Sequence, residues 1–157
     1  MNISVIDTIK TVVAYIESKA VGSRLEDHVF TGPQEERTNK YKEFCTINYV
    51  VNPTQYELGD SQSRTEIELT ITFGYRDDVT NVSGMEKEIG DTFFATYSRY
   101  LRSREFRRYM HSRGITIPPG YIDDGKLDEF APEFEGIRKY TIVINLWTFI
   151  ETLEDIP

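Results

Sequence analysis

The regular alternation of apolar and polar residues over 64–75 constrains the fold of this chain more than any other feature. One face of this segment carries Thr65, Ile67, Leu69, Ile71, Phe73 and Tyr75, and the other carries Glu66, Glu68, Thr70 and Thr72. A period of two residues is typical of a β-strand with one buried and one solvated face. Such strands belong to antiparallel sheets that are covered on one side. We therefore expect Glu66 and Glu68 to face water, or the lumen of an assembly.

Two further segments are predicted to be strands. Residues 44–51 place Cys45 and every second residue after it on one face, and Asn52-Pro53 is expected to end this strand. Residues 54–63 then form a turn or hairpin loop. Residues 138–151 are largely apolar on both faces, which predicts a central strand or one that is covered on both sides.

The remaining periodic segments predict helices. Over residues 4–20, apolar side chains recur at steps of three and four, as on an amphipathic helix. A second helix is expected to open with a capping box at Ser83 and to keep helical spacing through about Leu101. It then runs on, or restarts, to about Arg113, where Gly114 stops it.

These elements predict one α+β domain, because 157 residues suit a single domain. Its expected architecture is a single mixed, mostly antiparallel sheet with two main helices packed on one face. Residues 22–42 are expected to form a polar loop. Residues 114–137 hold three of the six prolines and form a polar excursion, which we interpret as an arm or as a loop that orders on a neighbour.

Charge is unevenly distributed along the chain. The net charge of −8 disfavours non-specific binding of DNA or of membranes, and no apolar run is long enough to span a bilayer. A basic block occupies positions 99–113 and consists of Arg99, Arg102, Arg104, Arg107, Arg108 and Arg113. An acidic block follows at 121–135 and includes Asp123, Asp124, Asp128 and Glu129. Opposite patches of this kind suit head-to-tail self-association. Pairing of the two blocks within one chain, or their simple solvation, are the alternatives.

The residues that usually carry chemistry are few. The sequence contains no phosphate-binding loop, nucleophile elbow or metalloprotease motif, and the two histidines, His28 and His111, stand in unrelated contexts. Cys45 lies on the apolar face of its predicted strand, which favours a buried side chain over a nucleophile. We therefore expect no enzyme activity, no cofactor and no metal site.

The order and size of the elements resemble the tail terminator (tail-completion) proteins of tailed bacteriophages. The comparable segments are IDTIKTVVAYIESKA, CTINYVV, RTEIELTITFGYRDD, SGMEKEIGDTFFATYSRYL and RKYTIVINLWTFIE. The resemblance implies a structural protein, made in the host cytoplasm, that forms a hexameric ring in the virion. Such a ring caps the tail tube, joins it to the head connector and lets DNA pass without specific binding.

On this interpretation, the basic and acidic blocks meet across ring subunits, and Glu66 and Glu68 line a negative lumen. Three other functions compete with it. Another phage neck or head–tail connector protein has the same size and acidity, and a monomeric acidic binding module has the same charge. A small enzyme with a site built on Asp and Glu would need a closed pocket that holds carboxylates with raised pKa values.

Overall fold

Three long strands organise the fold. The computed structural model describes residues 5–32, 41–57, 62–76, 84–118, 126–129 and 137–151. The long strands, each of 15 residues, are β2 (Glu43–Glu57), β3 (Gln62–Arg76) and β6 (Ile137–Glu151). β3 lies in the middle and pairs antiparallel with both neighbours, so that Ile71 faces Ile47 on β2 and Ile142 on β6. The prediction that 138–151 forms an inner strand is confirmed, because β6 has partners on both sides.

Three short strands complete a six-stranded sheet in the order β1-β2-β3-β6-β4, with β5 also on β6. β1 (Val29–Thr31) runs parallel to β2, whereas β4 (Ile115–Thr116) and β5 (Lys126–Glu129) pair antiparallel with β6. The sheet is therefore mixed and mostly antiparallel, and the predicted α+β class is confirmed. The expectation of a polar loop over 22–42 is wrong where the chain forms β1. This strand was missed because three residues are too few to display a two-residue period.

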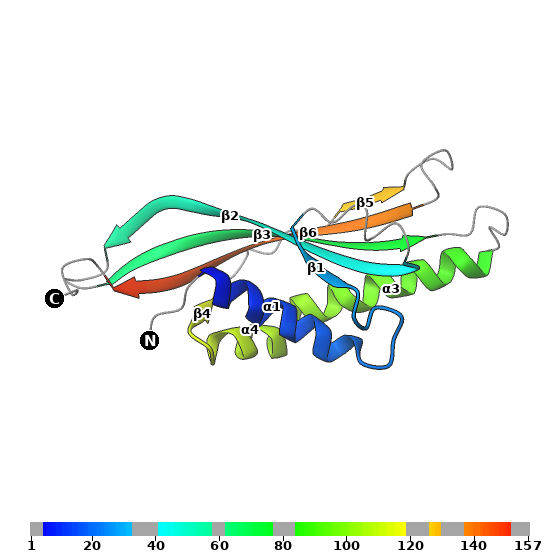
Figure 1. Ribbon diagram of the computed structural model, residues 1–157, viewed down its shortest axis with the longest axis horizontal. Helices are drawn as coiled ribbons and strands as arrows, with labels where there is room; N and C mark the ends of the chain where they lie inside the picture. Colours follow the sequence, from blue (N-terminus) through cyan, green and yellow to red (C-terminus); the bar gives the residue numbers. More distant parts are fainter. Residues whose placement is uncertain are drawn as a thin grey trace.

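The helices lie together on one side of the sheet (Figure 1). They are α1 (Val5–Ala20), α3 (Gly84–Arg102) and α4 (Arg104–His111). The second predicted helix restarts rather than running on, and Ser103 marks the break. The Ser103 hydroxyl accepts a hydrogen bond from the backbone N–H of Phe106 at 3.2 Å, which caps α4. Gly114 follows α4 with a φ of +79°, a conformation that favours glycine.

The core lies between the helices and the period-two face of the sheet. The β3 side chains from Ile67 to Tyr75 on this face are at most 1% exposed, as predicted. Aromatic rings from α3 pack on them, and the ring centroids of Phe73 and Tyr97 lie 5.1 Å apart. Burial of each such side chain stabilises the fold by roughly 1.5–3 kcal/mol, so this face holds the helices in place.

The expected end of the first long strand at Asn52-Pro53 was wrong. β2 continues to Glu57, and its register with β3 is irregular between Asn52 and Tyr56. Proline has no N–H to donate, so it is tolerated in a strand at a bulge or on an open edge. Both conditions hold here, because β1 pairs with β2 only at Cys45–Ile47. The strands also extend into the predicted hairpin loop, whose centre at 58–61 lies outside the described residues.

The remaining predicted features fall partly outside the described ranges. Of the excursion at 114–137, the structure describes 114–118, which include β4, as well as β5 and Ile137, the first residue of β6. Asp123 and Asp124 lie in the part that it does not describe. Ser83, the expected cap of the second helix, also lies outside these ranges. None of the helices within the described ranges is long and apolar enough to cross a membrane.

Candidate interaction surfaces

The predicted basic block runs from the end of α3 through α4. Five of its arginines are exposed, and the sixth, Arg107, is half-buried with its Nε atom buried. Two of the exposed side chains already have contacts within the chain. Arg102 Nε donates to the Ser98 hydroxyl at 3.1 Å, and the Arg113 guanidinium lies 3.6 Å from the centre of the Tyr109 ring. Among the described residues, Arg99, Arg104 and Arg108 make no ion pair. These three side chains are therefore the ones available to a partner.

The structure separates the part of the basic block that lies in α4 from the described part of the acidic block. Asp128 and Glu129 lie in β5, opposite Lys139 and Arg138 of β6. Figure 1 places β5 at one end of the sheet, well away from α4. α4 therefore lies too far from β5 to pair with it within one copy, whereas Arg99 of α3 lines a groove with Tyr140, the residue opposite Leu127 of β5.

The two glutamates predicted to face water or a lumen lie on the side of the sheet opposite the described helices. Glu68 is exposed, and it lies between Val50 of β2 and Asn145 of β6. Glu66 is half-buried between Asn52 and Trp147. This face therefore carries acidic side chains at the middle of the sheet.

Beyond Ile47, β2 forms an open edge. This interaction surface was not predicted from the sequence. The Ile47 carbonyl accepts a hydrogen bond from Gly32 N–H, so the backbone of Ile47 points outward toward β1. The two-residue period then points the backbone groups of Tyr49 and Val51 outward as well. Among the described residues these groups have no strand beside them. The sequence feature that could have indicated this edge is the absence of charged residues from Phe44 to Tyr56.

Apolar side chains at this edge are exposed. Tyr49 is 47% exposed and Val51 is 37% exposed, although they continue the face on which Cys45 and Ile47 are fully buried. Val50, on the opposite face, is 65% exposed. At the end of the sheet where β2 ends, the strands project past the helices (Figure 1). A consecutive apolar run on an open strand is typical of a surface that is covered in an assembly.

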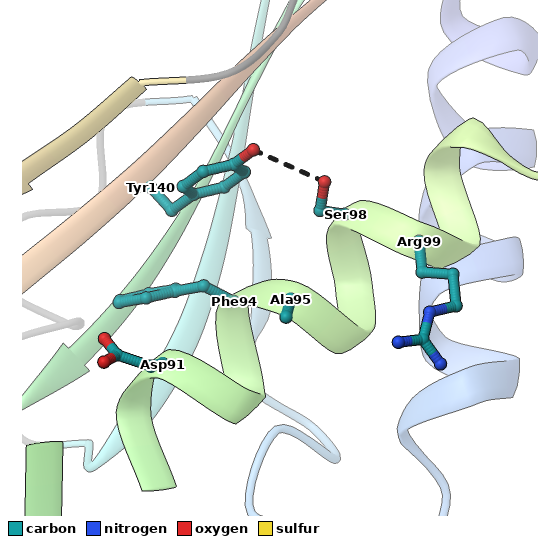
Figure 2. A pocket seen from close by; sticks show the side chains of 6 residues that line it. All are labelled: Asp91, Phe94, Ala95, Ser98, Arg99 and Tyr140. Atoms are coloured by element: carbon teal, nitrogen blue, oxygen red, sulfur yellow. Dashed lines mark hydrogen bonds between the residues drawn. The ribbon is translucent and has the colours of Figure 1, made fainter. Parts of the chain in front are cut away.

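A groove of about 430 Å³ lies between α3 and β6. It is lined by Asp91, Phe94, Ala95, Ser98, Arg99 and Tyr140. Figure 2 shows Tyr140 reaching from β6 toward α3, where its hydroxyl lies 3.3 Å from that of Ser98. The Phe94 ring stacks below it, with centroids 5.9 Å apart. The groove joins residues that lie far apart in the sequence.

The side chains considered for chemistry are held in structural roles. Cys45 is fully buried, and burial raises the pKa of its thiol, which keeps it protonated and unsuited to nucleophilic attack. His28 stacks on Tyr41 with ring centroids 3.8 Å apart, and its Nδ1 lies 2.8 Å from the Arg24 carbonyl oxygen. Within the described ranges, His, Cys, Asp and Glu side chains form no group of three or more that suits a metal ion.

No protein-family model and no curated protein sequence matches the chain. Function must therefore be inferred from the surfaces described above.

Proposed function

We propose that this protein is a structural subunit of a phage virion, a tail terminator whose copies close into a hexameric ring on the tail tube. The observation that carries the proposal is the open edge of β2. Tyr49, Val50 and Val51 expose apolar side chains beside backbone groups that no described strand covers. Soluble proteins usually protect such edges from pairing with further strands by charged residues, prolines or a covering segment. Over Asn48–Val51, β2 has neither a charge nor a proline, which favours a neighbouring subunit as its cover.

The charge distribution supports a head-to-tail arrangement of the copies. Arg104 and Arg108 of α4 lie apart from the acidic strand β5 within one chain. A contact between two different patches repeats from copy to copy, and it closes into a ring when the rotation allows. Such a contact is the proposed role of these arginines, with Asp128 and Glu129 on the neighbour.

The sheet face that carries Glu66 and Glu68 suits the inside of such a ring. Negative charge along a lumen repels the phosphates of DNA, so that DNA passes without sticking. The proposed partners are therefore other copies of this chain, the tail tube and the head connector.

Light scattering on the purified protein, with negative-stain images of the same sample, tests this proposal. We expect a hexameric mass and rings with a central hole, alone or after addition of purified tail tubes. A ring that binds the connector but not tubes would indicate the alternative, another neck protein. A protein that stays monomeric both alone and with tubes would contradict the proposal and favour a monomeric acidic binding module.

A further inference from the structure

The groove between α3 and β6 has an apolar floor and one basic end. Phe94, Ala95 and Tyr140 form the floor. Arg99 lies at one end, and Asp91 lies at the other (Figure 2). Arg102 also lies beside the groove, where its Nε donates to Ser98, but this side chain already has contacts within the chain. The Asp91 carboxylate is neutralised by Arg138, whose Nη1 lies 2.6 Å from it.

This pattern defines the chemistry of a fitting ligand. Apolar side chains would lie on the aromatic floor, and a carboxylate would face Arg99. A short peptide that combines both side-chain types meets these requirements. The chain itself contains such a peptide directly after β6, at residues 152–157, with the sequence Thr-Leu-Glu-Asp-Ile-Pro.

We propose that the groove of one copy binds residues 152–157 of a second copy. Leu153 and Ile156 supply the apolar side chains, and Glu154 and Asp155 supply the carboxylates. The contact joins two different surfaces, so it propagates from copy to copy. It rests on the proposed self-assembly for its biological setting, but the binding of the peptide is testable without any ring.

The geometry of β6 requires that the peptide come from another copy. Tyr140 lies near the start of β6, and Glu151 is its last residue. At about 3.3 Å per residue, some 36 Å of strand separates the two. Six fully extended residues span at most about 22 Å. A peptide that starts from the far end of β6 therefore falls short of the groove in its own chain.

The first experiment measures the binding of a fluorescently labelled peptide, IETLEDIP (residues 150–157), to a variant of the protein that ends at Glu151. We expect saturable binding in fluorescence anisotropy. Arg99→Glu should weaken it about tenfold, the equivalent of 1.4 kcal/mol. Lys10→Glu makes the same charge change at an exposed position of α1 and should leave binding unchanged. A peptide with Glu154→Gln and Asp155→Asn should also bind about tenfold more weakly.

The truncated protein must first be compared with the full chain by circular dichroism and thermal unfolding, to establish that it folds. No saturable binding by the folded protein, or equal binding by the Arg99→Glu and Lys10→Glu variants, would overturn the inference. Light scattering then separates the two proposals. A ring that persists without residues 152–157, together with absent peptide binding, refutes the groove inference alone. Arg99-dependent peptide binding by a chain that never forms a ring supports the groove inference and contradicts the ring.

Discussion

Arg138 of β6 lies in space that Gly90 of α3 leaves vacant. An ideal Cβ built on Gly90 would lie 2.0 Å from Nη2 of Arg138 and 2.9 Å from the Tyr75 ring. The arginine is 5% exposed, pairs with Asp91 and lies near the rings of Tyr75 and Phe94. The missing side chain at position 90 thus allows a buried cation to pack between the sheet and the helix.

Gly90→Ala should therefore destabilise the protein, against the usual trend. In a helix this substitution ordinarily stabilises by about 1 kcal/mol. Here the new methyl group displaces the buried guanidinium and presses on the Tyr75 ring, and an extra carbon forced into a packed site costs about 1–3 kcal/mol. We expect a net loss of about 1 kcal/mol in urea unfolding. In an Arg138→Met background the loss should be smaller, and an equal loss in both backgrounds would contradict the proposed clash.

Thr65 and Thr148 form a cross-strand pair whose hydroxyls are buried. They face each other in the β3–β6 register, and neither oxygen has a hydrogen-bond partner within the described structure. Because an unsatisfied buried hydroxyl costs about 1–3 kcal/mol, Thr65→Val or Thr148→Val should raise the free energy of unfolding by about 1 kcal/mol. Thr72→Val is the control, since the Thr72 hydroxyl lies 3.2 Å from that of Thr141. Destabilisation by both core substitutions would show that their hydroxyls are bonded.

Glu43 should make the stability depend on pH. Burial raises the pKa of its carboxyl above the ordinary 4.5, and the positive charges of Arg24, Lys42 and His28 oppose this less strongly. A raised pKa in the folded state means that the contribution of Glu43 is fully present below pH 4.5 and is lost as the pH rises through the folded pKa. Glu43→Gln should therefore be more stable than wild type at pH 7.

The gain from Glu43→Gln should shrink as the pH falls toward 4. Thermal unfolding of both proteins between pH 4 and 7 measures this difference. Glu88→Gln serves as the control, because Glu88 is exposed on α3. A Glu43→Gln variant that unfolds at the wild-type temperature at pH 7 would show that the charged carboxylate is well accommodated.

Val50→Lys should prevent self-association while leaving the fold intact. Val50 is 65% exposed on the open edge of β2, and lysine on an edge strand opposes further strand pairing. We expect at least about tenfold weaker association in light scattering. Val21→Lys is the matched control, because Val21 is 72% exposed in the turn after α1. Equal association of both variants with wild type would exclude the β2 edge as an interface.

Charge reversal in the basic block tests its proposed contact with the acidic block. Arg108→Glu is the appropriate single change, because Arg108 is exposed. Arg107 is half-buried, so its replacement would also disturb the packing around it. We expect weaker association, with a larger effect at low salt because exposed charges are screened. Lys10→Glu controls for the change in net charge. An oligomer that is unaffected by Arg108→Glu would remove the basic block from the interface.

The buried face of the sheet was predictable because alternation reflects strand geometry directly. Tyr75 and the alternating apolar residues before it on β3 are buried as their period indicates. The break at Ser103 was foreseen only as one option, since helical spacing persists on both sides of it. The end of β2 was misplaced because proline disrupts a strand only where its N–H is needed. At Pro53 the outer side of β2 has no partner among the described strands.

Neither the groove nor the contact between Gly90 and Arg138 could be predicted from the sequence. Phe94 and Tyr140 meet only because α3 packs across β6, and no local pattern records that packing. No feature of the sequence around Gly90 indicates this contact, because the arginine that needs the space lies in another element. The basic block was identifiable from composition, but which of its arginines are engaged depends on neighbours such as Ser98 and Tyr109.

The place of β6 in the chain governs when the protein can fold during synthesis. β3 and β6 pair along their full length, yet both α3 and α4 separate them in the sequence. Until residue 151 has left the ribosome, β6 is incomplete. β3 then lacks one of the two strands that flank it. The nascent chain therefore carries an incomplete sheet while residues 77–151 are being synthesised. Chaperones that shield apolar segments are expected to engage it before its last strand emerges.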